Sequence, residues 1–113
     1  MPRNISFALT TEQFINRTKT VTRRLGWDFL KAGDVLCAVE KGMGLKKGEK
    51  VRRLGLIEVV SAWPEPLEAI TAEDVVREGF PEMTSENFVE FFCRHNQVDP
   101  STIVNRIEFK YLD

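Results

Sequence analysis

Runs of hydrophobic residues, separated by turn residues, predict four strands in this chain. Residues 5–9 and 104–112 alternate between apolar and polar side chains, whereas residues 35–39 are apolar throughout and short enough to form a buried strand. A longer apolar stretch at 52–62 is followed by Pro64 and Pro66, which we expect to end it. Strands are therefore predicted at 5–9, 35–39, 52–62 and 104–112.

Helical spacing and capping residues predict two or three short helices. Thr10 or Thr11 can cap a helix of about two turns, and Thr71 precedes an acidic first turn of a helix that Gly79 should end. Residues 85–96 repeat the apolar spacing of a longer helix. Four or five strands with two or three short helices favour a small α+β domain, which we expect to be a partly closed barrel.

Length and composition indicate one intracellular domain that spans residues 1–113. A chain of 113 residues can bury a core without disulfides. Cys37 and Cys93 lie far apart, and no CxxC motif or Cys/His cluster accompanies them, so we expect two reduced thiols and no zinc site. The sequence has no apolar run that could span a bilayer and no signal peptide, which favours a cytoplasmic location without a membrane partner.

Charge is unevenly distributed along the chain. Residues 1–53 contain twelve lysines and arginines against five acidic residues, and residues 54–113 contain four against twelve. Part of the basic excess lies in a glycine-rich stretch at 41–50, which is expected to be an exposed loop and lacks the spacing of a P-loop. The asymmetry indicates either a basic face for an anionic ligand, such as RNA or a nucleotide phosphate, or two halves that attract each other within one fold.

The segment at 18–24 carries the most reactive set of residue types: one lysine, three threonines and two arginines. A lysine with a lowered pKa can act as a base, a threonine can become a nucleophile, and arginines bind oxyanions or phosphates. In a regular strand, Lys19 and Thr22 would point to opposite faces, so a shared site requires a turn or bulge between them. Solvated side chains or phosphate contacts are the alternative interpretation.

The pKa of Lys19 would have to fall from about 10.4 to about 7–8 for it to act as a base near neutral pH. Arginines 23 and 24 lower it by repulsion, whereas a nearby carboxylate would raise it. Glu78 lies at the predicted end of a helix, where a negative charge opposes the helix dipole, so it is either a functional or an ordinary surface residue. His95 is interpreted as a helix-end histidine, and Trp27 and Trp63 as packing residues or as a surface on which a base could stack.

Four short motifs in this order resemble those of the ASCH domain, a small β-barrel related to PUA domains. They are KTVTRR at 19–24, LKAGDVL at 30–36, REGF at 77–80 and IEF at 107–109. The resemblance implies a barrel with a cleft for RNA or a nucleoside. One bacterial branch hydrolyses N4-acetylcytidine with a lysine, a threonine and a glutamate, and the positions that match them here are Lys19, Thr22 and Glu78.

Similarity to that branch also assigns Arg24 to orienting the substrate or stabilising an oxyanion. Arg23 occupies a position where an apolar residue is expected, and the basic loop at 41–53 is longer than in that branch. Arg23, Arg24, Phe7 and Trp27 are the predicted substrate-binding residues. Neither the motif nor the composition requires a metal or another cofactor.

Three functions are therefore considered from the sequence. The first is an amidohydrolase of N4-acylated cytosine nucleosides, in which Thr22 attacks the acyl carbonyl while Lys19 and Glu78 move protons. The second is a non-catalytic RNA-binding ASCH module, and the third is a metal-independent ribonuclease on the same fold. The partner would be a nucleoside or single-stranded RNA, while the acyl group, the identity of the base and the oligomeric state stay open.

Overall fold

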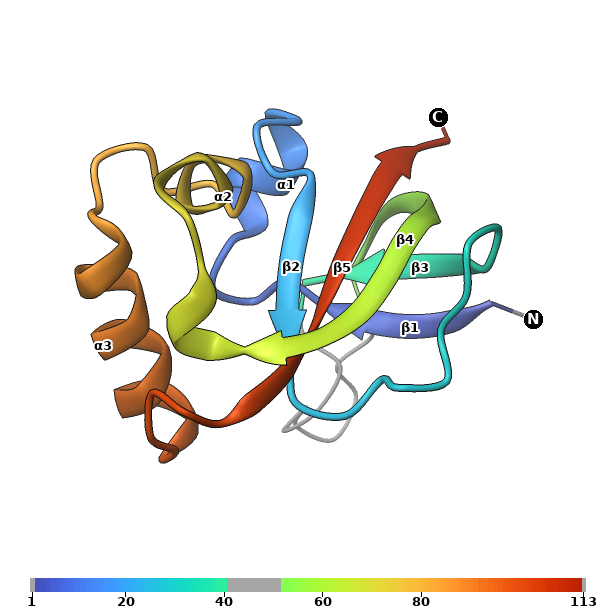
Figure 1. The fold of residues 1–113 in the computed structure, drawn as a ribbon. Helices are drawn as coiled ribbons and strands as arrows, with labels where there is room; N and C mark the ends of the chain where they lie inside the picture. Colours follow the sequence, from blue (N-terminus) through green and yellow to red (C-terminus); the bar gives the residue numbers. More distant parts are fainter. Residues whose placement is uncertain (1, 41–51, 113) are drawn as a thin grey trace, which may run out of the picture.

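The structure, a computed structural model, describes residues 2–40 and 52–112 and shows a curled sheet with helices at one side (Figure 1). Most of the predicted basic loop lies outside these residues. The elements in chain order are β1 (Arg3–Ser6), α1 (Thr11–Ile15), β2 (Val21–Arg24), β3 (Val35–Val39), β4 (Arg53–Pro66), the 3-10 helix η1 (Leu67–Ala69), α2 (Ala72–Arg77), α3 (Ser85–Asn96) and β5 (Ile103–Tyr111). The predicted α+β class is confirmed. No helix in the described ranges is long and apolar enough to cross a membrane.

The sheet has the strand order β1-β3-β4-β5-β2, in which β1 and β3 are parallel and the other pairs are antiparallel. Strand β4 pairs with β3 along its first half and with β5 along most of its length, and its register shifts between Val59 and Ser61. Such a bulge increases local twist and bends the strand. The two outer strands are joined by Arg24 of β2, whose Nη2 donates to the carbonyl of Ser6 at 2.6 Å. The sheet is therefore a half-barrel, consistent with the predicted partly closed barrel.

The prediction that Pro64 and Pro66 end the strand expected at 52–62 is wrong. Strand β4 continues to Pro66, and these two prolines lie opposite Asn105 and Ile103 of β5. The part of β4 that pairs with β3 ends at Glu58, so the second half of β4 has a free edge on that side. Prolines two residues apart direct their nitrogens to the same edge, where no ladder hydrogen bond is lost.

The N-terminal elements are shorter than predicted. Strand β1 ends at Ser6, although the Phe7 amide still donates to Val39 at 2.8 Å, and α1 has five residues instead of about two turns. Strand β2 was not among the predicted strands. By contrast, α3 spans the predicted residues 85–96, and β5 differs from the prediction by one residue at each end.

Two apolar clusters form the core. The first joins strands of the sheet to α1 and is made of Ile5, Phe7, Phe14, Leu30, Leu36, Ala38, Ile57, Val59, Ile107 and Phe109. The second joins α2 and α3 to η1 and the start of β5, and is made of Leu67, Ile70, Val75, Phe80, Phe88, Phe92 and Val104. Both cysteines are free thiols, with Cys37 buried and Cys93 half-buried. The helices thus form their own core beside the sheet.

The end of α2 brings Glu78 next to the segment before β2. The helix begins at Thr71, whose hydroxyl accepts from the Asp74 amide, and Glu78 is its C-terminal cap. Gly79 follows with φ +101°, a left-handed conformation that favours glycine. A Cβ atom built on Gly79 would lie 2.8 Å from Cγ of Gln13 and 3.6 Å from Cβ of Lys19. Glycine therefore allows α2 to end against the segment that carries Lys19.

We expect Gly79→Ala to destabilise the fold more than Gly33→Ala, which is a matched control. Both glycines have a positive φ, but a Cβ on Gly33 meets nothing within 4 Å. The left-handed backbone should cost each variant about 1–2 kcal/mol, and the contact with Gln13 should add about 1–3 kcal/mol to Gly79→Ala. Urea denaturation measures both free energies of unfolding, and equal losses would show that the close approach does not constrain the chain.

Candidate active site

The backbone around Lys19 is held in an irregular conformation by three neighbouring elements. The amides of Thr18 and Lys19 both donate to the carbonyl of Gln13, at 3.0 and 3.3 Å. The Thr20 amide donates to the last residue of α2, and the Tyr111 hydroxyl on β5 donates to the Lys19 carbonyl. Strand β2 begins only after these contacts. The break that a shared site requires is therefore present before β2.

Lys19 and Glu78 form a buried ion pair. The Nζ atom of Lys19 donates to Oε1 of Glu78 at 2.7 Å and to the backbone carbonyl of the same residue at 2.8 Å. Both residues are nearly inaccessible, with 2% and 3% of their surface exposed. The ammonium group thus neutralises both the carboxylate and the partial negative charge at the C-terminal end of α2. This explains why a glutamate is tolerated where the helix dipole disfavours it.

Burial lowers the pKa of Lys19 from its usual value, because the charged ammonium loses water. The charge and the hydrogen bond of Glu78 act in the opposite direction, and Arg24 and Arg23 reinforce the lowering by repulsion. The net direction is downward. Lys19 therefore loses its proton more readily than a lysine in water, which general-base chemistry requires.

Thr22 is held by Arg24, two residues along β2. The Nε atom of Arg24 donates to Oγ1 of Thr22 at 3.0 Å, and the guanidinium lies over the ring of Phe7, 5.0 Å from its centroid. Burial lowers the pKa of Arg24 to about 10, although Glu78 opposes this. Because the threonine oxygen accepts from a cation, its own proton is free to be donated to a base. Among the described residues, no hydrogen bond joins Thr22 directly to Lys19 or Glu78.

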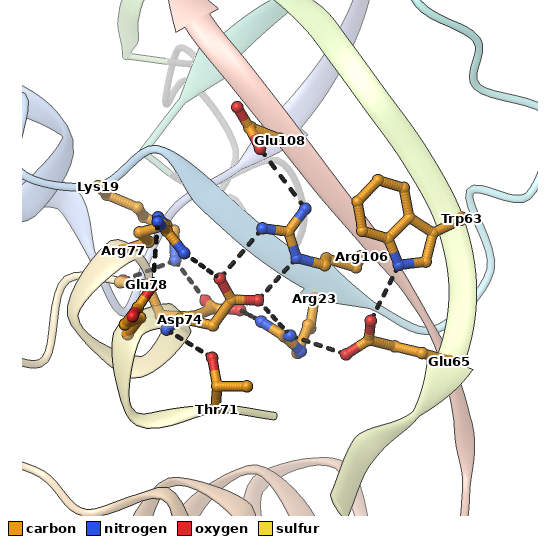
Figure 2. A network of polar contacts seen from close by, with 11 residues as sticks. Lys19, Arg23, Trp63, Glu65, Thr71, Asp74, Arg77, Glu78, Arg106 and Glu108 are labelled. Atoms are coloured by element: carbon orange, nitrogen blue, oxygen red, sulfur yellow. Dashed lines mark hydrogen bonds and ion pairs between the residues drawn. The ribbon is translucent and has the colours of Figure 1, made fainter. Parts of the chain in front are cut away.

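Arg23 connects the Lys19–Glu78 pair to a larger network of carboxylates and arginines, drawn in Figure 2. Its Nη2 atom donates to Asp74 at 2.6 Å and to Glu65 at 2.8 Å, and its Nη1 lies 3.4 Å from Glu78. Burial lowers the pKa of Arg23, but the hydrogen bonds that Arg23 donates to Asp74 and Glu65, with the negative charges around it, outweigh burial, and the net shift is upward. Arg23 is therefore a fixed cation that links β2 to α2 and β4.

Asp74 is the centre of this network. Its Oδ2 accepts from Arg23 and from Nε of Arg106, each at 2.6 Å, and its Oδ1 accepts from Arg106 and Arg77, each at 3.0 Å. Arg106 also lies beneath the ring of Trp63, 4.6 Å from its centroid. The hydrogen bond from Arg106 is the main cause that lowers the pKa of Asp74 far below its usual range, and burial opposes it.

A cleft of about 200 Å³ contains the predicted catalytic residues. Lys19, Thr22 and Glu78 all line it, together with Arg23 and Arg24. The other lining residues come from the loop after β1, from Phe80, and from the face of α3 that carries Phe88, Phe91, Phe92, His95 and Asn96. The three residues matched by resemblance thus share one cleft, although they come from two regions almost sixty positions apart.

The two aromatic residues predicted to bind the substrate, Phe7 and Trp27, do not line this cleft. Phe7 is buried in the first apolar cluster, where it supports Arg24, and Trp27 packs at the edge of the same cluster. His95 was interpreted only as a helix-end residue. It does lie in the last turn of α3, but it also faces the cleft, and its spacing of four from Phe91 is the sequence signal that places both on one side of α3.

Two basic residues of the first half of the sequence form buried ion pairs with acidic residues of the second half. Lys19 and Arg23 of the basic half pair with Glu65, Asp74 and Glu78 of the acidic half. In the ranges that the structure describes, no group of three or more histidine, cysteine, aspartate or glutamate side chains is placed to hold a metal ion. The cleft offers an amine, a carboxylate, hydroxyls, guanidinium groups and the imidazole of His95.

Comparison with solved structures places this architecture in a known class of fold. The sequence matches no protein-family model, and no curated protein is significantly similar to it. A crystal structure of an Enterococcus faecalis V583 protein, described by the family model DUF984, superimposes with a TM-score of 0.71 at 16% identity, covering 100% of this chain and 81% of that one. An ASCH domain from Lactobacillus crispatus JV V101 gives a TM-score of 0.61 at 13% identity, covering 96% and 78%. The chain therefore has an ASCH-like fold, as its motifs predicted.

We expect Asp74→Asn to destabilise the protein by about 3–5 kcal/mol, because two buried arginines lose the charge between them. The pKa of Asp74 is lower in the folded than in the unfolded chain, so its contribution is present above about pH 4 and is lost as pH falls below it. The variant should show a weaker loss of stability than the parent over this acidic range. Denaturant titrations at several pH values measure this, with exposed Asp28→Asn as the control; an unchanged acid slope in Asp74→Asn would contradict it.

Proposed function

We propose that this protein is an amidohydrolase that removes the acyl group from N4-acylated cytosine nucleosides. One observation carries the proposal: the buried Lys19–Glu78 pair lines the same cleft as the hydroxyl of Thr22, which Arg24 holds at 3.0 Å. This combination contains a proton acceptor, a nucleophile and a cation for a developing oxyanion. The resemblance of the motifs to the N4-acetylcytidine-hydrolysing branch supports the choice of substrate.

In the first step, Oγ1 of Thr22 attacks the acyl carbonyl carbon. The hydroxyl proton passes to the Lys19–Glu78 pair, and Arg24 lies beside the hydroxyl to stabilise the negative oxygen of the tetrahedral intermediate. The C–N bond then breaks, and the pair returns the proton to the exocyclic amine as it leaves. The products of this step are cytidine and an acyl ester of Thr22.

In the second step, water hydrolyses the ester. The same pair accepts a proton from the water, the C–O bond to Thr22 breaks, and the threonine oxygen regains a proton as the carboxylic acid leaves. Because Nζ of Lys19 and Oε1 of Glu78 are 2.7 Å apart, either residue can hold the transferred proton during both steps. The pair, rather than one residue alone, is therefore the proposed acid and base.

The contacts favour this chemistry over phosphate binding by the same residues. Lys19 and Arg23 are buried and paired with carboxylates, whereas phosphate-binding side chains must reach the nucleic acid backbone. Under this proposal the modified base belongs to a free nucleoside or to RNA, since an ASCH-like fold is consistent with either ligand. The phosphates of RNA would then contact other residues.

Purified protein is expected to convert N4-acetylcytidine to cytidine and acetate without an added metal. Thr22→Val should abolish turnover because it keeps the side-chain shape and removes the nucleophile, while Thr22→Ser should retain part of it. Lys19→Ala and Glu78→Gln should each lower kcat by about 10²- to 10⁴-fold. Liquid chromatography of the products measures these rates.

Lys110→Ala is the matched control, because Lys110 is exposed on β5 and forms its ion pair with Glu58 away from the cleft. It should keep the parent rate. Each variant must also show a cooperative unfolding transition, so that a lost rate is not a lost fold. Parent-like kcat in a folded Lys19→Ala or Thr22→Val protein would overturn the proposed mechanism.

A further inference from the structure

One wall of the cleft is aromatic and has no part in the proton transfers. Phe91 and His95 lie one helical turn apart on α3, with their rings nearly parallel at 17° and their centroids 6.3 Å apart. Both line the cleft that contains Lys19, Thr22 and Glu78. A hydrophobic core needs neither an exposed imidazole nor a ring stacked on it, so the geometry calls for another explanation.

Phe91 is held in place by contacts with two other aromatic rings. Its centroid lies 5.6 Å from that of Phe80, in an edge-on arrangement, and 6.4 Å from that of Phe88. Both of these residues belong to the second apolar cluster. The wall is therefore attached to the core, and a ligand ring that stacks on it would require little ordering of the protein.

The volume of the cleft and the apolar residue that the loop after β1 contributes to its lining favour a small ligand. A volume of about 200 Å³ is below the roughly 300–1,000 Å³ that is typical of pockets for drug-sized molecules. The loop after β1 contributes Leu9, a large apolar side chain that is 52% exposed. A cleft lined by aromatic rings, an apolar loop residue and polar groups suits one planar heteroaromatic ring with its acyl group.

We infer that Phe91 and His95 form the subsite that binds the base, and that they determine specificity for acyl groups attached to a planar ring. This inference rests on the proposed function for the identity of the substrate. The residues act on binding: the ring stacks on the wall while its exocyclic amide extends toward Thr22. Acylated aliphatic amines lack this contact and should be poor substrates.

Kinetics of α3 variants test the subsite. Base stacking on an aromatic side chain is worth about 1–3 kcal/mol, so His95→Ala and Phe91→Leu should each raise KM for N4-acetylcytidine at least about fivefold and leave kcat within about twofold. His95→Phe, which keeps a ring, should restore KM. Arg94→Ala is the control, since Arg94 is the neighbour of His95 but pairs with Glu90 and does not line the cleft. An unchanged KM in both ring-deleting variants would overturn the inference.

Nuclear magnetic resonance separates this inference from the proposed function, because His95 is the only histidine of the chain and its ring gives one Hε1 signal in untagged protein. In Thr22→Val protein, N4-acetylcytidine and cytidine should move this signal in a saturable way, whereas N-acetylethanolamine should not. A saturable shift without hydrolysis by the parent would support the subsite and contradict the amidohydrolase. Hydrolysis with no shift and no change in KM would support the amidohydrolase and overturn the subsite.

Discussion

The structure depends on a carboxylate that separates two arginines. Arg23 of β2 and Arg106 of β5 are direct cross-strand partners, an arrangement that is destabilising for like charges in an isolated sheet. Asp74 accepts a hydrogen bond of 2.6 Å from each. Because Asp74 belongs to α2, the repulsion within the sheet becomes an attraction between the sheet and this helix. A six-residue helix with little apolar surface is thereby held in one position.

The position of α2 determines the geometry of the cleft. Four residues after Asp74, at the end of the helix, Glu78 meets Lys19, and Gly79 allows the two backbones to approach. The same contact keeps Lys19 out of the strand that begins at Val21, so that Lys19 and Thr22 line one cleft despite their odd spacing. Arg24 completes the arrangement by joining Thr22 to the other edge of the sheet through Ser6. The geometry of the cleft and the stability of the fold thus depend on neighbouring residues of α2 and its C-terminal cap, Asp74 and Glu78.

Local sequence signals predicted the elements whose stability is local. Residues 85–96 carry a continuous apolar face and residues 35–39 a continuous apolar run, and both elements were found where expected. Strand β2 was missed because its partner β5 lies more than eighty residues away, and β4 was cut short because the free edge that tolerates Pro64 depends on where β3 ends. The resemblance identified Lys19, Thr22 and Glu78, but no spacing in the sequence could show that Glu78 reaches Lys19. His95 was not predicted as a site residue, because its position near the end of a helix was sufficient to explain a histidine there.

The electrostatics of the cleft explain why Arg23 occupies a position where an apolar residue was expected. The charge and the hydrogen bond of Glu78 raise the pKa of Lys19 and so favour the ammonium form. Arg23 approaches Glu78 from the other side, at 3.4 Å, and shares its negative charge. Burial is the main cause that lowers the pKa of Lys19, and the charges of Arg24 and Arg23 add to it. Through Arg23, the network that stabilises α2 therefore also contributes to the lowered pKa of Lys19.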